Sequence, residues 1–143
     1  MKKIISLTVI LLLFSLSSCS IKTSYDYMHD TQDIVEVHIA TFYWDDQRNV
    51  CHDEIKKIDD IDAFLRDFNE LNCYKWQGDP RGLSKENEGN YIIKFLYSNG
   101  DYELIDWHGI AKYTTSDDRL RNYRGYRRFD EAQFKNFVQG YLE

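Results

Sequence analysis

The stretch RLRNYRGYRR, residues 119–128, combines cationic and aromatic side chains that suit an anionic ligand. Arginine forks bind carboxylates and phosphates through paired donors, and tyrosine rings offer faces for stacking. The stretch holds five arginines and no acid, whereas the rest of the chain is acidic. We expect either a contact site for an anionic partner (a lipid headgroup, a surface polymer or an acidic protein) or a strand whose arginines pair with the domain's own acids or guard a sheet edge. The residues concerned are Arg119, Arg121, Tyr123, Arg124, Tyr126, Arg127 and Arg128.

Catalytic and metal-binding patterns are weak along the whole chain. The four histidines lack the close pairing typical of metal sites, so we predict no metal centre and no cofactor. Cys51 and His52 are adjacent and would point to opposite faces of a strand, so His52 is badly placed to activate the thiol. The segment GDPRG lacks the lysine and hydroxyl of a phosphate loop. We therefore expect no enzyme, with a hydrolase using convergent acids kept as an alternative.

The N-terminus suggests an export signal that ends at a cysteine. A basic tip, Met1 to Lys3, precedes an apolar run from Ile4 to Leu16, which is too short to span a bilayer. The run leads into LSSC, residues 16–19, which resembles the lipobox of bacterial lipoprotein signals. The resemblance implies that residues 1–18 are removed and that the sulfur of Cys19 carries a diacylglycerol. Two acyl chains meet the requirement for stable anchoring without a transmembrane helix.

This resemblance also implies a location in the cell. The protein would be held by lipid at the cell membrane or the outer membrane, facing away from the cytoplasm.

Without residues 1–18 the chain has 16 basic and 24 acidic residues, a net charge of −8, which argues against nucleic-acid binding. Residues 19–33 are polar and lack an apolar period, so we interpret them as a lipid-anchored tether. Residues 34–143 suit one domain.

Cysteine content favours a disulfide once Cys19 is acylated. Cys51 and Cys73 then remain as an even pair in an exported protein. A bond between them would close a loop of ~23 residues and stabilise the fold by roughly 3 kcal/mol in the chain-entropy model. The alternative is two separate buried thiols.

Hydrophobic periodicity predicts the elements of the domain. Strands are expected over 33–44, 50–58 and 110–114 and within 119–129, with amphipathic helices over 59–72 and from Asp130 onward. Residues 91–107 suggest a hairpin turning at Asn99-Gly100, with Tyr97 opposite Tyr102 and Phe95 opposite Leu104. The order indicates an α+β fold, an antiparallel sheet of about five strands with two helices packed on one face. It looks like the pattern of several small, uncharacterised bacterial lipoproteins, a resemblance that implies no activity.

These observations favour a lipid-anchored binding or accessory module facing outside the cytoplasm, without catalytic activity. A structural envelope lipoprotein is the alternative, ahead of the hydrolase. The expected partners are the membrane, through the lipid on Cys19, and a protein or anionic surface. Contact would be made through exposed aromatic residues, the arginine stretch or the polar loop at 77–90.

Overall fold

A computed structural model describes residues 22–47, 50–75, 83–115, 117–121 and 127–143 of the chain. Within these ranges the chain forms nine strands, two α-helices and two short 3-10 helices. The strands are β1 (Lys22–Thr23), β2 (Ile34–Trp44), β3 (Val50–Lys57), β4 (Cys73–Lys75), β5 (Tyr91–Tyr97), β6 (Tyr102–Ile105), β7 (Ile110–Thr114), β8 (Asp117–Arg121) and β9 (Arg127–Phe129). The α-helices are α2 (Ile61–Asn69) and α3 (Glu131–Leu142), and the 3-10 helices are Thr31–Asp33 and Lys85–Asn87.

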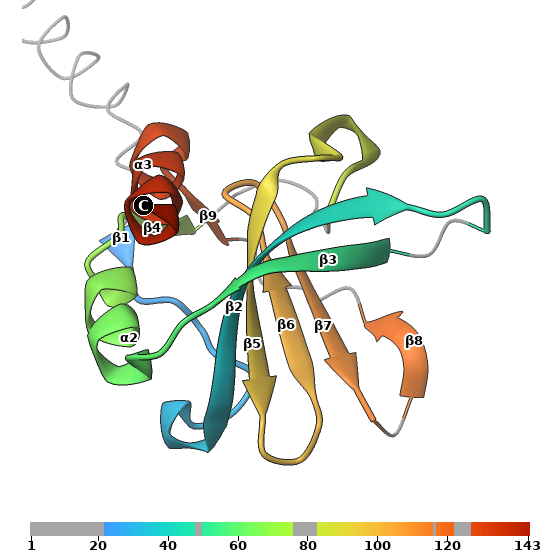
Figure 1. Ribbon diagram of the computed structural model, residues 1–143, viewed down its shortest axis with the longest axis horizontal. Coiled ribbons are helices and arrows are strands. Elements are labelled where there is room, and N and C mark those ends of the chain that lie inside the picture. Colours follow the sequence, from blue (N-terminus) through green and yellow to red (C-terminus); the bar gives the residue numbers. More distant parts are fainter. Residues whose placement is uncertain (1–21, 48–49, 76–82, 116, 122–126) are drawn as a thin grey trace, which may run out of the picture.

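The strands build two antiparallel sheets (Figure 1). Among the described residues, the larger sheet has the order β3-β2-β5-β6-β7-β8 and the smaller sheet the order β1-β4-β9. Both helices contribute to one core on the same face of the larger sheet, with Phe64 and Phe68 from α2 and Phe134 and Val138 from α3. The predicted α+β class is confirmed. The larger sheet holds six strands in the described residues, one more than the five or so expected.

The helices form where local sequence signals favour them. The Asp60 carboxylate caps α2 by accepting a hydrogen bond from the Ala63 amide at 2.9 Å. The Asp130 carboxylate caps α3 in the same way, through the Gln133 amide at 2.9 Å. Gln133 does not complete a capping box, because its side-chain oxygen accepts from the amide of Asn72 at 2.7 Å and so joins α3 to the chain before β4.

The larger sheet curls so that the edge strand β3 approaches β6. The long strand β2 pairs with β5 along one edge and with β3 along the other, and the β2–β3 register shifts between Ile39 and Ala40. The rings of His52 on β3 and Tyr102 on β6 lie 5.9 Å apart although β2 and β5 separate their strands in the sheet. The enclosed face carries a second apolar cluster of Ala40, Phe42, Leu83, Ile92, Leu104 and Ala111.

The β5–β6 hairpin differs by one residue from the predicted register. Leu96 stands opposite Tyr102, and the Tyr97 amide donates to the Asp101 carbonyl at 2.9 Å, so three residues form the loop. Gly100 takes φ +87°, the left-handed conformation that ends a three-residue loop with a bulge. The predicted two-residue turn is therefore wrong, and a shift of one residue moves each side chain of β6 to the other face.

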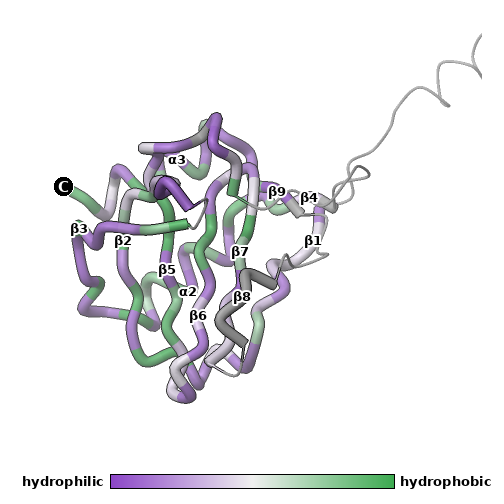
Figure 2. The backbone as a smooth tube through the Cα atoms, turned by 90° about the vertical axis from the view of Figure 1, so that its right-hand side faces the viewer, coloured by the Kyte–Doolittle hydropathy of each residue, from purple (hydrophilic) through white to green (hydrophobic). Residues whose placement is uncertain are grey.

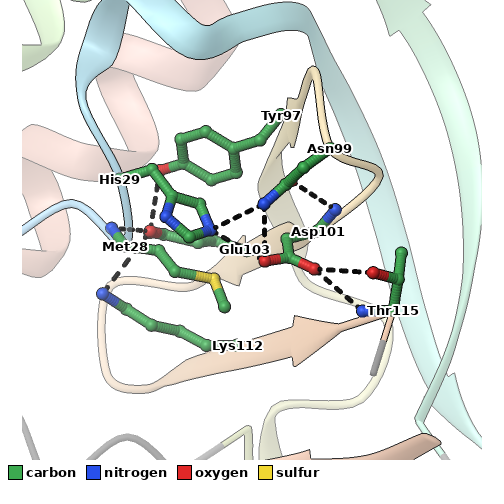
Figure 3. Close-up of polar contacts among 8 residues, drawn as sticks. All are labelled: Met28, His29, Tyr97, Asn99, Asp101, Glu103, Lys112 and Thr115. Atoms are coloured by element: carbon green, nitrogen blue, oxygen red, sulfur yellow. Dashed lines mark hydrogen bonds and ion pairs between the residues drawn. The ribbon is translucent and has the colours of Figure 1, made fainter. Parts of the chain in front are cut away.

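The shifted register places Glu103 opposite Phe95, with its side chain fully buried on the helix-covered face. Its carboxylate accepts hydrogen bonds from the Met28 amide and, at 2.8 Å, from the Tyr97 hydroxyl (Figure 3). It also accepts one from the Tyr25 hydroxyl. The Lys112 ammonium lies 3.4 Å from the same carboxylate. A buried charge is tolerable only with such partners, and Glu103 has donors from three separate segments.

A second buried carboxylate lies beside the first. Asp101 contacts the His29 ring nitrogen at 2.8 Å, the Asn99 amide group at 2.9 Å and the Thr115 backbone amide at 2.8 Å (Figure 3). Lys112 also donates to the Asp26 carbonyl at 2.8 Å. These bonds fix the segment before β2 across β6 and β7.

The predicted tether is wrong for residues 22–33, which belong to the domain. β1 pairs with β4, and the Tyr25 ring is buried against Phe68 and Phe129. The segment lacks a period of its own because its side chains bond to residues 42 to 78 positions away, including Asn69 for Tyr27 and Glu103 for Tyr25. The predicted boundary at residue 34 therefore excludes residues that complete the core.

Replacing Tyr25 by phenylalanine should lower the free energy of unfolding by about 2 kcal/mol, because a hydrogen bond to a charged group contributes ~1.5–3 kcal/mol. Tyr27→Phe is the matched control, since the Tyr27 hydroxyl donates to Asn69 at an exposed site. That variant should lose under about 1 kcal/mol. Urea denaturation of both variants measures the difference, and equal losses would contradict a special role for Glu103.

Candidate functional site

A pocket of about 300 Å³ lies between α3 and the start of β5. Its apolar lining includes Phe134 and Val138, which are both 1% exposed, and the Trp107 ring from the β6–β7 connection. Tyr91 is 43% exposed at the first position of β5 and forms part of the wall. An apolar cavity bordered by an exposed aromatic ring suits a small apolar group.

Polar groups border this apolar lining. The lining includes Asn90, Lys135 and Gln139, so amide and ammonium donors stand at the pocket. The Lys135 ammonium contacts Glu131 one helical turn earlier at 2.6 Å, with both side chains about half exposed. Such an exposed pair is weak and readily exchanges partners. The pocket therefore offers apolar contact inside and adaptable polar contact at its edge.

Trp107 adds a specific feature to the pocket. Its indole N–H is buried and has no hydrogen-bond partner among the described residues. The Trp107 backbone is fixed, because its carbonyl accepts from the Phe129 amide at 2.9 Å and its amide donates to Asp106 at 2.6 Å. A buried donor without an acceptor is uncommon in folded proteins and indicates a place for a ligand atom or a water.

The residues of the pocket were not identified as a site from the sequence. The sequence predicts Phe134 and Val138 on the apolar face of the last helix. It predicts Tyr91 and Trp107 at the two ends of the hairpin. Their helical and strand spacing indicates burial but not convergence. They come from three separate segments, and only the packing of α3 against β5 brings them together.

A second set of polar and aromatic side chains lies on the face away from the helices. The Tyr102 and Tyr113 rings stack with centroids 4.4 Å apart, and the Lys94 ammonium stands 5.4 Å from the Tyr102 centroid. Trp44 and Tyr113 each leave a buried polar atom without a partner among the described residues. This face has aromatic surface, but Tyr102 is already covered by its neighbours.

Ion pairs link three strands on the same face. Glu54 contacts Lys94 at 2.6 Å and the His38 ring at 3.2 Å, and Glu36 contacts the other His38 nitrogen at 2.8 Å and Lys57 at 2.6 Å. Hydrogen bonding from Lys57 and then from His38 lowers the pKa of Glu36 to about 2. Hydrogen bonding from Lys94 lowers the pKa of Glu54. Both carboxylates stay ionised at neutral pH and serve to hold the strands in register.

Two ionisable neighbours on β3, Cys51 and His52, were considered as a catalytic pair from the sequence. Burial, and then the Lys94 charge, lower the pKa of His52, which keeps its ring neutral at pH 7. Cys51 stands opposite Tyr43 and His52 opposite Phe42, so the two neighbours point to opposite faces of β3. In the part of the chain that is described, no group of three or more His, Cys, Asp and Glu side chains is arranged to hold a metal ion.

The structure describes the arginine stretch only in part. The backbone of residues 119–121 belongs to β8 and that of 127–128 to β9, and the Arg128 side chain is exposed. Tyr123, Arg124 and Tyr126 lie outside the described residues. β8 and β9 belong to different sheets, so the described ends of the stretch are in different places. Contact with an anionic partner remains a prediction.

Cys19 and the apolar run before it also lie outside the described residues, so the lipid anchor remains a prediction. Among the helices that the structure describes, none has the length and apolar character needed to cross a bilayer.

The predicted disulfide is wrong in this structure, where Cys51 and Cys73 are separate thiols. Cys51 is on β3 of the larger sheet, half-buried and opposite Tyr43. Cys73 is on β4 of the smaller sheet, 1% exposed and opposite Phe129 in the core. The spacing of two cysteines along the chain does not report the sheet to which each belongs.

The two thiols should therefore differ in reactivity. Without reduction, iodoacetamide should alkylate Cys51 in the folded protein, whereas Cys73 should react only after denaturation because it is buried. Mass spectrometry of the digested protein measures each site. Protection of both thiols until a reductant is added would contradict this prediction and restore the disulfide.

Comparisons with known proteins return no relatives: no family model, no curated protein and no solved structure matches the chain. The features from which a function can be inferred are accordingly the pocket, the buried carboxylates Glu103 and Asp101, and the ion pairs on the face away from the helices. Of these, only the pocket combines open volume, exposed aromatic surface and a buried donor that has no partner among the described residues.

Proposed function

We propose that this protein is a lipid-anchored binding module on the outer side of a bacterial membrane, and that the pocket beside α3 receives an apolar side chain of a partner protein. The observation that carries the proposal is the pocket, with Phe134 and Val138 in its lining and Tyr91 exposed. In the part of the chain that the structure describes, the Trp107 indole N–H there has no acceptor. Such anchoring pockets supply much of the affinity of protein interfaces.

The size and chemistry of the pocket favour this occupant. A volume of about 300 Å³ is at the lower end of the range for ligand sites, which suits one side chain better than an extended small molecule. The Trp107 indole N–H can donate a hydrogen bond to a backbone carbonyl of the partner protein, next to the side chain that the pocket receives. Lys135 and Gln139 can bond to polar groups at the edge of the contact.

The state of the buried carboxylates supports binding over hydrolysis. Acid–base catalysis by a carboxyl pair needs two groups whose environments separate their pKa values and which can reach a substrate. Glu103 and Asp101 are instead surrounded by donors from their own chain. A purely structural envelope protein would leave the pocket without an occupant, which makes that alternative less favoured.

The anchor can be tested at Cys19. Because LSSC resembles a lipobox, Cys19→Ala should abolish incorporation of a fatty-acid analogue and release the protein from membranes or leave it unprocessed. Metabolic labelling followed by membrane fractionation measures both effects. Equal labelling of the variant and the wild type would refute lipid attachment at this residue.

The pocket can be tested with two exposed tyrosines. Tyr91 is 43% exposed and lines the pocket, whereas Tyr43 is 40% exposed on β2 and does not. Tyr91→Ser should reduce the amount of partner captured from detergent-solubilised membranes by roughly tenfold, the effect of losing ~1.4 kcal/mol of binding energy. Tyr43→Ser should leave capture unchanged at similar stability.

Quantitative mass spectrometry of the captured proteins supplies the readout for both variants. The same set of partners retained by Tyr91→Ser would show that the pocket is not the contact, whatever the fate of the anchor.

A further inference from the structure

The smaller sheet is strongly basic for a protein with an acidic body. Its strands β1, β4 and β9 contain eight residues, of which four are basic and none is acidic. Lys22, Tyr74 and Arg128 stand in register across the three strands. Lys22 and Arg128 are exposed, and Tyr74 lies between them.

The smaller sheet also lies very close to the predicted anchor in sequence. Only two residues separate Cys19 from Lys22, so the two Cα atoms are at most about 11 Å apart even in a fully extended chain. The segment that follows Lys22 is held on the domain, so it does not lengthen the link between the anchor and the rest of the domain. The bonds from Met28 and His29 to the two buried carboxylates (Figure 3), together with the bond from Tyr25 to Glu103, hold that segment on the domain.

We propose that the smaller sheet is the membrane-facing surface and that Lys22 and Arg128 bind anionic lipid headgroups. The proposal rests on the acylation of Cys19 in the proposed function, which places that residue at headgroup level. Attraction between a surface cation and anionic lipid extends over about one Debye length, ~8 Å at physiological ionic strength. The short link keeps Lys22 near this range. Tyr74, between the two cations, is a residue type enriched at membrane interfaces.

Charge distribution favours this orientation over others. After removal of residues 1–18 the chain has a net charge of −8, so most of its surface would be repelled by an anionic membrane. Within the described residues, the strands of the smaller sheet have a local excess of basic residues. Figures 1 and 2 both place β1 and β3 on opposite sides of the molecule, so the β2–β3 hairpin would extend away from the lipid.

The test uses the full-length, acylated protein in vesicles of phosphatidylcholine alone or mixed with phosphatidylglycerol. A membrane-impermeant amine reagent is added, and mass spectrometry measures its reaction at each lysine. Lys22 should react about fivefold more slowly in the phosphatidylglycerol vesicles, the factor expected for one cation at an anionic surface. Lys56 and Lys85, exposed on β3 and before β5, serve as internal controls and should not change.

High salt and one variant test whether the protection of Lys22 comes from its charge or only from its closeness to the membrane. Raising the salt concentration should remove most of the protection of Lys22, since screening shortens the attraction. Arg128→Gln should weaken the protection, whereas Lys56→Gln should not. Equal reactivity of Lys22 in both kinds of vesicle would overturn the headgroup contact while leaving the anchor intact. Failure of the anchor is distinguishable, because the protein would then carry no acyl chain and would not be recovered with either vesicle.

Discussion

The fold depends on the burial of one carboxylate. Glu103 is fully buried on the helix-covered face of the larger sheet, where an ionised group without partners would be prohibitively costly. Its partners come from β5, from β7 and from the segment before β2, which must all be in place together. Burial, and then the charge of Glu103, raise the pKa of the Tyr25 hydroxyl, which keeps it protonated as a donor. The N-terminal segment is therefore required for the core as well as joined to it.

The sequence predicted the elements far better than it predicted their register. Both helices follow from apolar spacing and aspartate caps, which are local signals. The β5–β6 turn was predicted wrongly because Asn99-Gly100 suits a two-residue loop as well as a three-residue loop. The side chains on either side did not distinguish between the two loop lengths. One residue of difference put Glu103, in place of Leu104, opposite Phe95 and so in the core. A local ambiguity thus hid the buried carboxylate that joins β5, β7 and the segment before β2.

Features that need distant segments were beyond the reach of sequence patterns. The segment at 22–33 looks like a tether because its bonds to Glu103 and Asp101 span 72 or more positions. Tyr91, Trp107 and Phe134 each carry a signal for burial, and nothing in their spacing shows that they line one pocket. Cys51 and Cys73 were predicted as a pair only because two cysteines remain once Cys19 is acylated. The structure has them on different sheets.

The burial of Glu103 also determines what an anchor at Cys19 would do. If residues 19–33 were a flexible tether, the domain would sample many orientations and many distances from the membrane. With Tyr25 and Met28 bonded to Glu103, only residues 20 and 21 remain between the anchor and β1. A force on the lipid then acts directly on a segment that completes the core. Orientation at the membrane and stability of the fold consequently depend on the same hydrogen bonds.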